Sequence, residues 1–333
     1  MTFDWKTIFR RLTRGDYRFS VILAALLLFL PSAWAQEREI RIGISPWIST
    51  KEFNDNITAF KKRLELVGFV EGKNTIYYQE NALGDPQKQA QIIQSFVQKK
   101  VDLIYSLGTS GTLIAKNITK EIPIVFSISV FPMETGIIKS LASSENNCVG
   151  TRNYISVGKQ LEVLLSIVPE IRSIGVIHLK EDPDSTIRLE RMKEITKVLG
   201  IQVIDMAASD LNQLQEILNE KADAYYLTCD TLIQNGGEEI AIDAANKRKI
   251  PTLSCNRSGI LKGALVGDVV DLESLGTASG KKAAAILNGE KPTDIITETQ
   301  QGSYVMINLK TANLLGLPTP YQALSIASEI IQE

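Results

Sequence analysis

Histidine and cysteine are scarce in this chain of 333 residues, which contains one histidine and three cysteines. Catalytic triads and many metal sites depend on these residue types, so His178 is the one histidine that could act as a general base. No CxxC pair is present, and the acidic run Glu181, Asp182 and Asp184 has no second cluster with metal-ligand spacing. The sequence therefore predicts neither a metal site nor a cofactor.

A hydrophobic run long enough to cross a bilayer is also missing. The apolar run Val21–Leu30 is about half as long as the roughly 20 residues that a transmembrane helix needs. It follows a basic start and precedes the small-residue motif Ala33-Trp34-Ala35, which is the pattern of a secretory signal peptide over residues 1–35. We expect cleavage before Gln36 and a periplasmic location. Retention of the segment as a membrane anchor is the alternative.

The chain has no block of basic residues. It contains 36 Lys and Arg against 38 Asp and Glu, and five of the basic residues belong to the expected signal peptide. A mildly acidic mature chain of this kind argues against a nucleic-acid partner. The remaining length suffices for two lobes of ordinary domain size.

Three cysteines are an odd number for an oxidising compartment. Cys229 and Cys255 fall near the ends of strands that we expect to be neighbours, so a disulfide between them is possible. Buried free thiols, which include Cys148, are the interpretation that we favour.

Apolar runs of strand length alternate with amphipathic helical stretches along the mature chain. This rhythm predicts an α/β fold with parallel sheets. The expected strands are residues 39–45, 102–108, 122–129, 173–179, 201–207, 223–229 and 250–255, and the clearest helices are 56–67, 86–99, 185–199 and 211–221.

The second half of the chain repeats the landmarks of the first half in the same order. The matching pairs are Gly43 and Gly175, Gly68 and Gly200, Asp102 and Asp223, and Pro123 and Pro251. We infer two similar lobes with a cleft between them, because loops at the carboxyl ends of parallel strands form ligand crevices. The expected lobes are residues 36–153 completed by about 270–290, and residues 154–269 completed by 291–333.

The loops at these strand ends carry weak signals for chemistry. A secreted hydrolase that uses His178 and Ser185 is one hypothesis, but no G-x-S-x-G motif exposes a serine. Asp182-Pro183 has the pattern of a helix N-cap followed by proline at the first helical position. The motif "GTSGT" at 108–112 is typical of an anion-binding turn, although it lacks the lysine of a P-loop.

Longer stretches resemble a known family. The stretches "DLIYSLGTSGTLIAKN", "IPIVFSISVFPMETGII", "DAYYLTCDTLIQ", "GALVGDVVDLESLG" and "INLKTANLLGLPTP" occur in the order found in the ABC transporter substrate-binding protein family. This family includes tryptophan-binding and tyrosine/phenylalanine-binding members. The resemblance implies the type I periplasmic-binding-protein fold, with two Rossmann-like lobes joined by hinge crossovers. It also implies a non-catalytic protein that closes around a small-molecule ligand and docks on an ABC permease in the inner membrane.

The resemblance also implies which loops bind the ligand. The positions that it carries over are Gly108, Thr109, Ser110, Ser127, Ser129, Phe131, Asp184, Ser185, Asp230 and Thr231. The placement of loops at strand ends adds Ser45, Trp47, His178 and Asn256.

One departure from the family affects the expected ligand. Asp184 stands where the family has asparagine, and an ionised carboxylate cannot donate a hydrogen bond to a ligand carboxylate. An amino acid, an amine, a nucleoside-like molecule and another small solute therefore all stay open. We expect a monomer that serves a permease, and a ligand-sensing subunit of a membrane signalling protein is the alternative.

Overall fold

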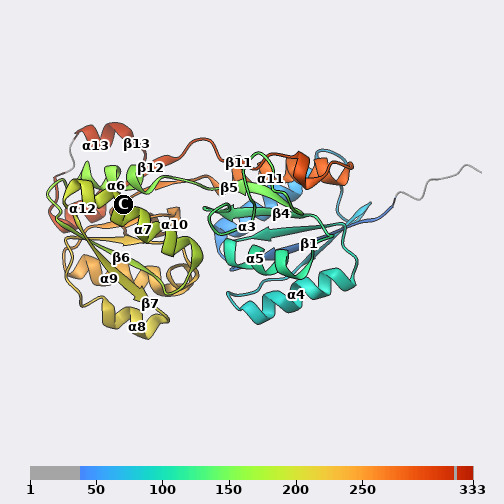
Figure 1. Ribbon diagram of the computed structural model, residues 1–333. Helices are drawn as coiled ribbons and strands as arrows, with labels where there is room; N and C mark the ends of the chain where they lie inside the picture. The colour runs from blue at the N-terminus through green and yellow to red at the C-terminus, as the bar shows by residue number, and fades with distance from the viewer. Residues whose placement is uncertain (1–37, 319–320, 333) are drawn as a thin grey trace, which may run out of the picture. The chain divides into compact units, whose positions relative to one another are not determined.

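Two β-sheets with helices on their faces make up the computed structural model, which describes residues 38–318 and 321–332 (Figure 1). Every element below belongs to the compact unit Ile40–Glu333 and carries the label used in Figure 1. The expected signal peptide, residues 1–35, lies outside the described residues. Within the described part of the chain, no helix is long and apolar enough to cross a membrane.

The first sheet has six strands, all parallel, in the order β11-β5-β4-β3-β1-β2. We call this sheet and its helices the first lobe. Its strands are β1 (Ile40–Pro46), β2 (Thr75–Gln79), β3 (Leu103–Leu107), β4 (Ile124–Ser129), β5 (Cys148–Arg152) and β11 (Glu298–Thr299). Its helices are α3 (Lys51–Glu65), α4 (Pro86–Gln98), α5 (Thr109–Ile118), α11 (Leu272–Leu287) and the 3₁₀ turn η2 (Pro292–Asp294).

The second sheet has seven strands in the order β13-β12-β10-β9-β8-β6-β7, and only the β10–β12 pair is antiparallel. This sheet and its helices form the second lobe. Its strands are β6 (Ser173–Leu179), β7 (Gln202–Ala208), β8 (Ala224–Leu227), β9 (Thr252–Ser254), β10 (Val266–Val269), β12 (Tyr304–Asn308) and β13 (Ala327–Ile331). Its helices are α6 (Val157–Leu165), α7 (Pro183–Leu199), α8 (Leu211–Ile217), the π-turn η1 (Ile233–Gly237), α9 (Glu238–Lys247), α10 (Arg257–Leu261), α12 (Leu309–Leu315) and α13 (Tyr321–Ile326).

The two lobes share a strand order, which confirms the predicted α/β class. The order β2-β1-β3-β4-β5 in the first sheet corresponds to β7-β6-β8-β9-β10 in the second sheet. All seven predicted strands are present, with ends shifted by up to two residues. Strands β2, β5 and β10 to β13 were not predicted, because they are short and carry polar residues or glycine.

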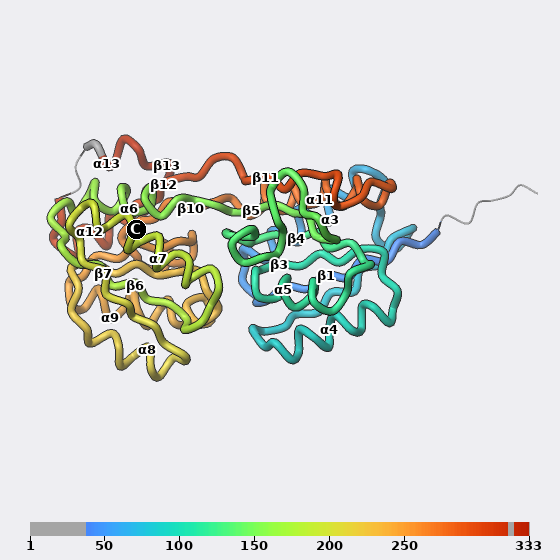
Figure 2. Tube along the Cα trace, in the orientation of Figure 1, coloured from blue at the N-terminus to red at the C-terminus, as the bar shows by residue number. Residues whose placement is uncertain are grey.

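The chain passes between the sheets three times (Figure 2). The passages follow β5, β10 and β11, and the second one leads to α11, which packs against α3. Residues 291–299, which we assigned to the second lobe, lie instead with the first sheet, because β11 pairs with β5.

The N-cap residues determine where helices α7, α3 and α5 begin. The Asp182 side chain accepts a hydrogen bond from Ser185 N, and Pro183 occupies the first position of α7, as predicted. Thr50 caps α3 in the same way, so this helix begins at Lys51, five residues before the predicted start. Helix α5 follows Gly108, which provides no side-chain cap, so its first backbone N–H groups lack a capping oxygen from the N-cap residue.

A close contact between α3 and α11 holds the returning helix on the first lobe. A Cβ atom at Gly276 would lie 2.1 Å from the backbone oxygen of Asn56, so only glycine permits this approach. The buried Asn56 side chain donates to Ser127 Oγ and to Leu272 O, and it accepts from the hydroxyl of Tyr105. The hydrogen bonds of this one amide therefore connect α3 with β3, β4 and α11.

Candidate ligand-binding site

A cavity of about 180 Å³ is lined by residues of both lobes. Residues at or just after the carboxyl ends of β1, β3, β4, β6, β8 and β9 contribute to it, and the passages between the sheets complete the wall. The carboxyl ends of parallel strands meet there, which is the usual position of a ligand crevice in such sheets. An engineered cavity of about 150 Å³ holds benzene, so the space suits a small organic molecule.

Nine of the fourteen residues that we predicted for the site line this cavity. They are Trp47, Gly108, Thr109, Ser110, Asp184, Ser185, Asp230, Thr231 and Asn256. The other five predicted residues do not line it, namely Ser45, Ser127, Ser129, Phe131 and His178.

Those five side chains have partners within the protein. Ser45 Oγ donates to Gln89, Ser127 Oγ accepts from Asn56, and the Ser129 hydroxyl lies 2.8 Å from that of Thr109. Phe131 is buried and makes an edge contact with Tyr154. These side chains therefore stabilise the loops through contacts within the protein.

His178 and Ser185 have separate partners. The buried imidazole of His178 contacts Leu179 O through Nδ1 and Asp205 Oδ1 through Nε2, at 3.0 and 2.9 Å. Ser185 Oγ donates to Asp230 Oδ2 at 3.1 Å. No hydrogen bond between His178 and Ser185 is found in the described part of the chain, so the arrangement lacks the contact on which a serine–histidine nucleophile depends.

Two hydrogen bonds join the lobes across the cavity. Trp47 Nε1 in the first lobe donates to Thr231 Oγ1 in the second lobe at 2.7 Å. The Thr109 hydroxyl donates to Asp184 Oδ2 at 2.6 Å. These bonds bring the β1 and β3 loops of the first lobe against the β8 and β6 loops of the second lobe.

Asp184 is the carboxylate that faces the first lobe. The residue as a whole keeps some exposed surface, but its Oδ1 atom is inaccessible to solvent and has no hydrogen-bond partner. Burial raises the pKa of this carboxyl, while the hydrogen bond from Thr109 and the nearby charge of Arg188 act in the opposite direction.

Asp230 uses its carboxylate to organise the second lobe. Leu179 N, Ser185 Oγ and Thr228 Oγ1 donate to Oδ2, at 2.6, 3.1 and 2.6 Å. Ile233 N donates to Oδ1 at 3.0 Å. Four protein donors therefore occupy the carboxylate that the family resemblance assigned to the ligand.

Asp182 adds a third carboxylate to this side of the cavity. Burial, together with the negative charges of Asp230 and Asp184, raises its pKa to about 6. Its hydrogen bond from Ser185 N acts against this rise. The three carboxylates lie at the start of α7 and in the β8 loop, and no group of three or more acidic, histidine or cysteine residues in the described segments could hold a metal ion.

Arg188 is a cavity residue that the sequence reasoning missed. It lies one helical turn after Asp184 on α7 and is 4% exposed. Its Nη1 donates to Tyr226 Oη at 2.9 Å and to Gln160 Oε1 at 3.3 Å, and its guanidinium lies 5.8 Å from the ring of Phe131. The spacing of four residues from Asp184 could have indicated a shared helix face. Other cavity residues that we missed include Asn153, Ile155, Gln234, Val269, Asp271 and Tyr304.

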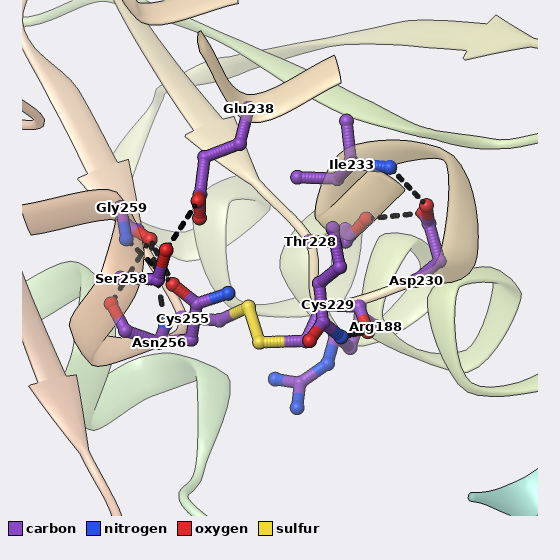
Figure 3. Close-up of a disulfide and its surroundings, with 12 residues drawn as sticks. Arg188, Thr228, Cys229, Asp230, Ile233, Glu238, Cys255, Asn256, Ser258 and Gly259 are labelled. Atoms are coloured by element: carbon purple, nitrogen blue, oxygen red, sulfur yellow. Dashed lines mark hydrogen bonds between the residues drawn. A yellow bond between two sulfur atoms is a disulfide. The ribbon is translucent and has the colours of Figure 1, made fainter. Parts of the chain in front are cut away.

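Cys229 and Cys255 form a disulfide, so our preferred interpretation of two free thiols was wrong. The bond joins the loop that carries Asp230 to the loop that carries Asn256 (Figure 3). These cysteines follow the paired strands β8 and β9, which brings their Cα atoms to 5.9 Å. Cys148 is a buried free thiol, as expected.

The disulfide also positions the loop in which Asn256 caps the start of helix α10. Asn256 Oδ1 accepts from Gly259 N at 2.8 Å, and Ser258 Oγ donates to Glu238 Oε2 at 2.9 Å (Figure 3). Arg257, next in the chain, pairs with Glu329 of β13. The side chains of this loop are thus largely engaged by the second lobe itself.

Backbone strain marks the end of strand β4. Ile128 lines the cavity with a φ of 55°, which is rare for a β-branched residue, and the register of β4 against β5 shifts between Phe126 and Ser129. Strain of this kind costs about 1–3 kcal/mol and collects at ligand sites.

Comparisons with known proteins agree with this architecture. The family described as "ABC transporter substrate binding protein" matches residues 41–331. A protein named "Tyrosine-binding protein" from Clostridioides difficile is 31% identical over 284 residues, which cover 84% of this chain and 82% of that protein.

Solved structures show the same fold. An ABC domain from Streptococcus pneumoniae in complex with L-Trp has a TM-score of 0.84 at 22% identity, and the match covers 88% of this chain and 100% of that chain. A ligand-free, open substrate-binding protein with adhesive properties from Clostridium difficile has a TM-score of 0.69 at 28% identity, with the same coverage. The two sheets, the passages between them and the match over nearly the whole described chain lead to one conclusion: the chain belongs to the ABC transporter substrate-binding protein family.

Proposed function

We propose that the chain captures a small molecule, an amino acid or a related metabolite, between its two lobes and delivers it to the permease of an ABC importer. The observation that carries this proposal is the pair of hydrogen bonds across the cavity, Trp47 to Thr231 and Thr109 to Asp184. They join two lobes that the chain connects only through three passages, so a ligand in the cavity can stabilise a closed arrangement. The relatives named for tyrosine and L-Trp support the ligand class.

The protein acts by binding and not by turnover in this proposal. The family is one of substrate-binding proteins, and His178 and Ser185 have separate partners. We assign ligand contact to the nine predicted residues at the cavity and to Arg188.

Export and delivery complete the proposal. The pattern of residues 1–35 supports a signal peptide that is cleaved before Gln36, and the mature chain then acts in the periplasm as a monomer. Amino-terminal sequencing of the protein from the periplasmic fraction tests this step, and a chain that still begins at Met1 would contradict it.

A thermal-shift screen of residues 36–333 against amino acids, amines and other small metabolites tests the binding function. A ligand that binds only the folded state stabilises it by about 2.7 kcal/mol at 100 times its dissociation constant. We expect a saturable rise in melting temperature with a subset of these molecules. If the whole collection leaves the melting temperature unchanged, the proposed function fails.

A further inference from the structure

We propose that the ligand is an organic amine cation that lacks a carboxylate beside its amino group, because Asp184 supplies a carboxylate to the first lobe from within the chain. The inference rests on the proposed function and specifies its ligand. It depends on where Asp184 lies, on the charges around the cavity and on the apolar wall.

A carboxylate-binding cradle exists in the first lobe. We define it as the Thr109 hydroxyl at the start of α5 together with the backbone N–H groups of Val130 and Phe131. Thr109 donates to Asp184 Oδ2 at 2.6 Å, and the backbone N–H groups of Val130 and Phe131 act to lower the pKa of the same carboxyl. No side chain of the N-cap residue Gly108 competes for the uncapped end of α5, where the helix dipole favours negative charge.

Asp184 reaches this cradle from the other lobe. Its Oδ1 atom is buried without a hydrogen bond of normal geometry, although the N–H groups of Val130 and Phe131 lie nearby. A carboxylate brought by a ligand would have to share the cradle with this charge. Two carboxylates at one set of donors repel each other, and an ionised aspartate has no proton to donate between them.

Arg188 acts as the counter-charge of Asp184. The guanidinium is buried one turn further along α7, and its Nη1 is engaged by Tyr226 and Gln160. A buried carboxylate needs such compensation to stay ionised. Arg188 therefore balances a charge that the protein already contains.

The remaining charges around the cavity favour a cation. The lining includes seven carboxylates, Glu52, Asp55, Asp182, Asp184, Asp230, Asp271 and Glu273, against the two guanidinium groups of Arg188 and Arg257. Arg257 is paired with Glu329 and Asp55 with Lys51, so these charges are balanced within the chain. A ligand ammonium near Asp182 would relieve the repulsion that this side chain experiences from Asp230 and Asp184.

Apolar side chains also line the cavity and can accept a hydrocarbon or aromatic body. Trp47, Phe53, Ile155, Val269, Leu272 and Tyr304 line it. With a cavity volume of about 180 Å³, an aromatic ring system with a short amine-bearing chain fits the space.

Matched pairs of molecules test the inference. Tyramine and tryptamine differ from tyrosine and tryptophan only by the carboxylate, and isothermal titration of residues 36–333 compares each pair. We expect each amine to bind at least about tenfold more tightly than its parent amino acid, because a like charge at the cradle costs 1.4 kcal/mol or more. The variant Asp184→Asn should reverse the order, since an amide can donate to a ligand carboxylate.

A second variant distinguishes the effect of the cradle on ligand affinity from the effect of the overall negative charge of the cavity. Glu52→Gln removes one carboxylate from the cavity wall outside the cradle. It should weaken amine binding slightly and strengthen amino-acid binding much less than Asp184→Asn does, because Glu52 lies outside the cradle. Circular dichroism of both variants checks that they fold.

Three outcomes would overturn the inference. The first is that the unaltered chain binds tyrosine or tryptophan more tightly than the matching amine. The proposed function would still hold in that case. The second is that Glu52→Gln and Asp184→Asn increase the affinity for amino acids equally, because the cradle would then have no special role. Absence of binding by both amines and amino acids also overturns it, and the metabolite screen then decides whether the proposed function fails as well.

Discussion

Trp47 and Thr231 lie 184 positions apart in the sequence, yet the indole Nε1 donates to the threonine hydroxyl at 2.7 Å. Trp47 follows strand β1 of the first lobe, and Thr231 follows β8 of the second lobe. The bond therefore forms only when the lobes are closed. It makes closure, and hence ligand affinity, depend on one donor and one acceptor.

Removing either partner should weaken ligand binding. Trp47→Phe keeps an aromatic wall without the donor, and Thr231→Val keeps the shape without the acceptor. A hydrogen bond of this kind contributes about 0.5–1.5 kcal/mol, so we expect a two- to tenfold loss of affinity for each variant. Titration calorimetry with the solute found by the screen measures it. The double variant should lose no more than the worse single variant, and fully additive losses would contradict the bond.

Gly84 controls how closely the lobes approach. A Cβ atom at this position would lie 2.6 Å from Thr231 Cγ2, which belongs to the other lobe. We expect Gly84→Ala to reduce ligand affinity at least about tenfold, because overpacking at a contact costs about 1–3 kcal/mol. The same titration measures the effect.

Gly72→Ala is the matched control for that substitution. Both glycines have a φ of +78°, so alanine meets the same backbone strain at each, but nothing lies within 4 Å of a Cβ at Gly72. The control should lose stability without losing affinity. Equal affinity losses in the two variants would show that strain, and not the contact with Thr231, is responsible.

Local patterns in the sequence predicted most of the strands and the start of α7. Apolar runs are local signals, and Asp182 with Pro183 defines a helix start without help from the rest of the chain. Strands β2 and β10 were missed because polar residues or glycine interrupt their apolar pattern: β2 begins with a threonine and ends with a glutamine, and β10 contains a glycine and an aspartate. Their pairing depends on neighbours that are distant in the sequence.

The site could be predicted only at the level of loops. Whether a side chain in such a loop faces the cavity depends on the phase of the strand or helix beside it, so Ser45 points to Gln89 while Trp47 reaches the cavity. The bond between Thr109 and Asp184 crosses 75 positions and two lobes. Arg188 was missed, and the disulfide was considered possible but not preferred, because the contacts of both depend on tertiary distances.

The disulfide should account for a substantial part of the stability of the second lobe. It closes a loop with a sequence separation of 26 residues, and the chain-entropy model gives about 3.5 kcal/mol for a loop of this length. We expect the double variant Cys229→Ser, Cys255→Ser to lose about 3 kcal/mol in urea unfolding. Cavity binding should weaken too, because the Asp230 and Asn256 loops lose their link.

Reductant provides the control for the disulfide. Dithiothreitol should lower the unfolding free energy of the unaltered chain and leave that of the double variant unchanged, since Cys148 is a free thiol in both. A stability of the unaltered chain that does not respond, with reduction verified by mass, would contradict a structural role for the bond.

Asp182 should give the stability a measurable pH dependence. Its pKa is raised to about 6 by burial and by the charges of Asp230 and Asp184, above the value of about 3.9 for an unfolded chain. The folded state therefore binds more protons between about pH 4 and pH 6, so the contribution of this group to stability falls as the pH rises through that window. Asp182→Asn removes the charge and keeps an equally good N-cap for α7.

We expect Asp182→Asn to gain stability relative to the unaltered chain as the pH rises from about 4.5 to 7, by about 1–2 kcal/mol after allowance for solvent screening. Urea unfolding of both proteins across this range measures the difference. Asp210→Asn makes the same exchange at the exposed N-cap of α8 and provides the comparison. If the two variants follow the same trend with pH, the carboxylate cluster around Asp182 does not carry the effect. A larger rise for Asp182→Asn indicates that the cavity contains negative charge that a cationic ligand would relieve.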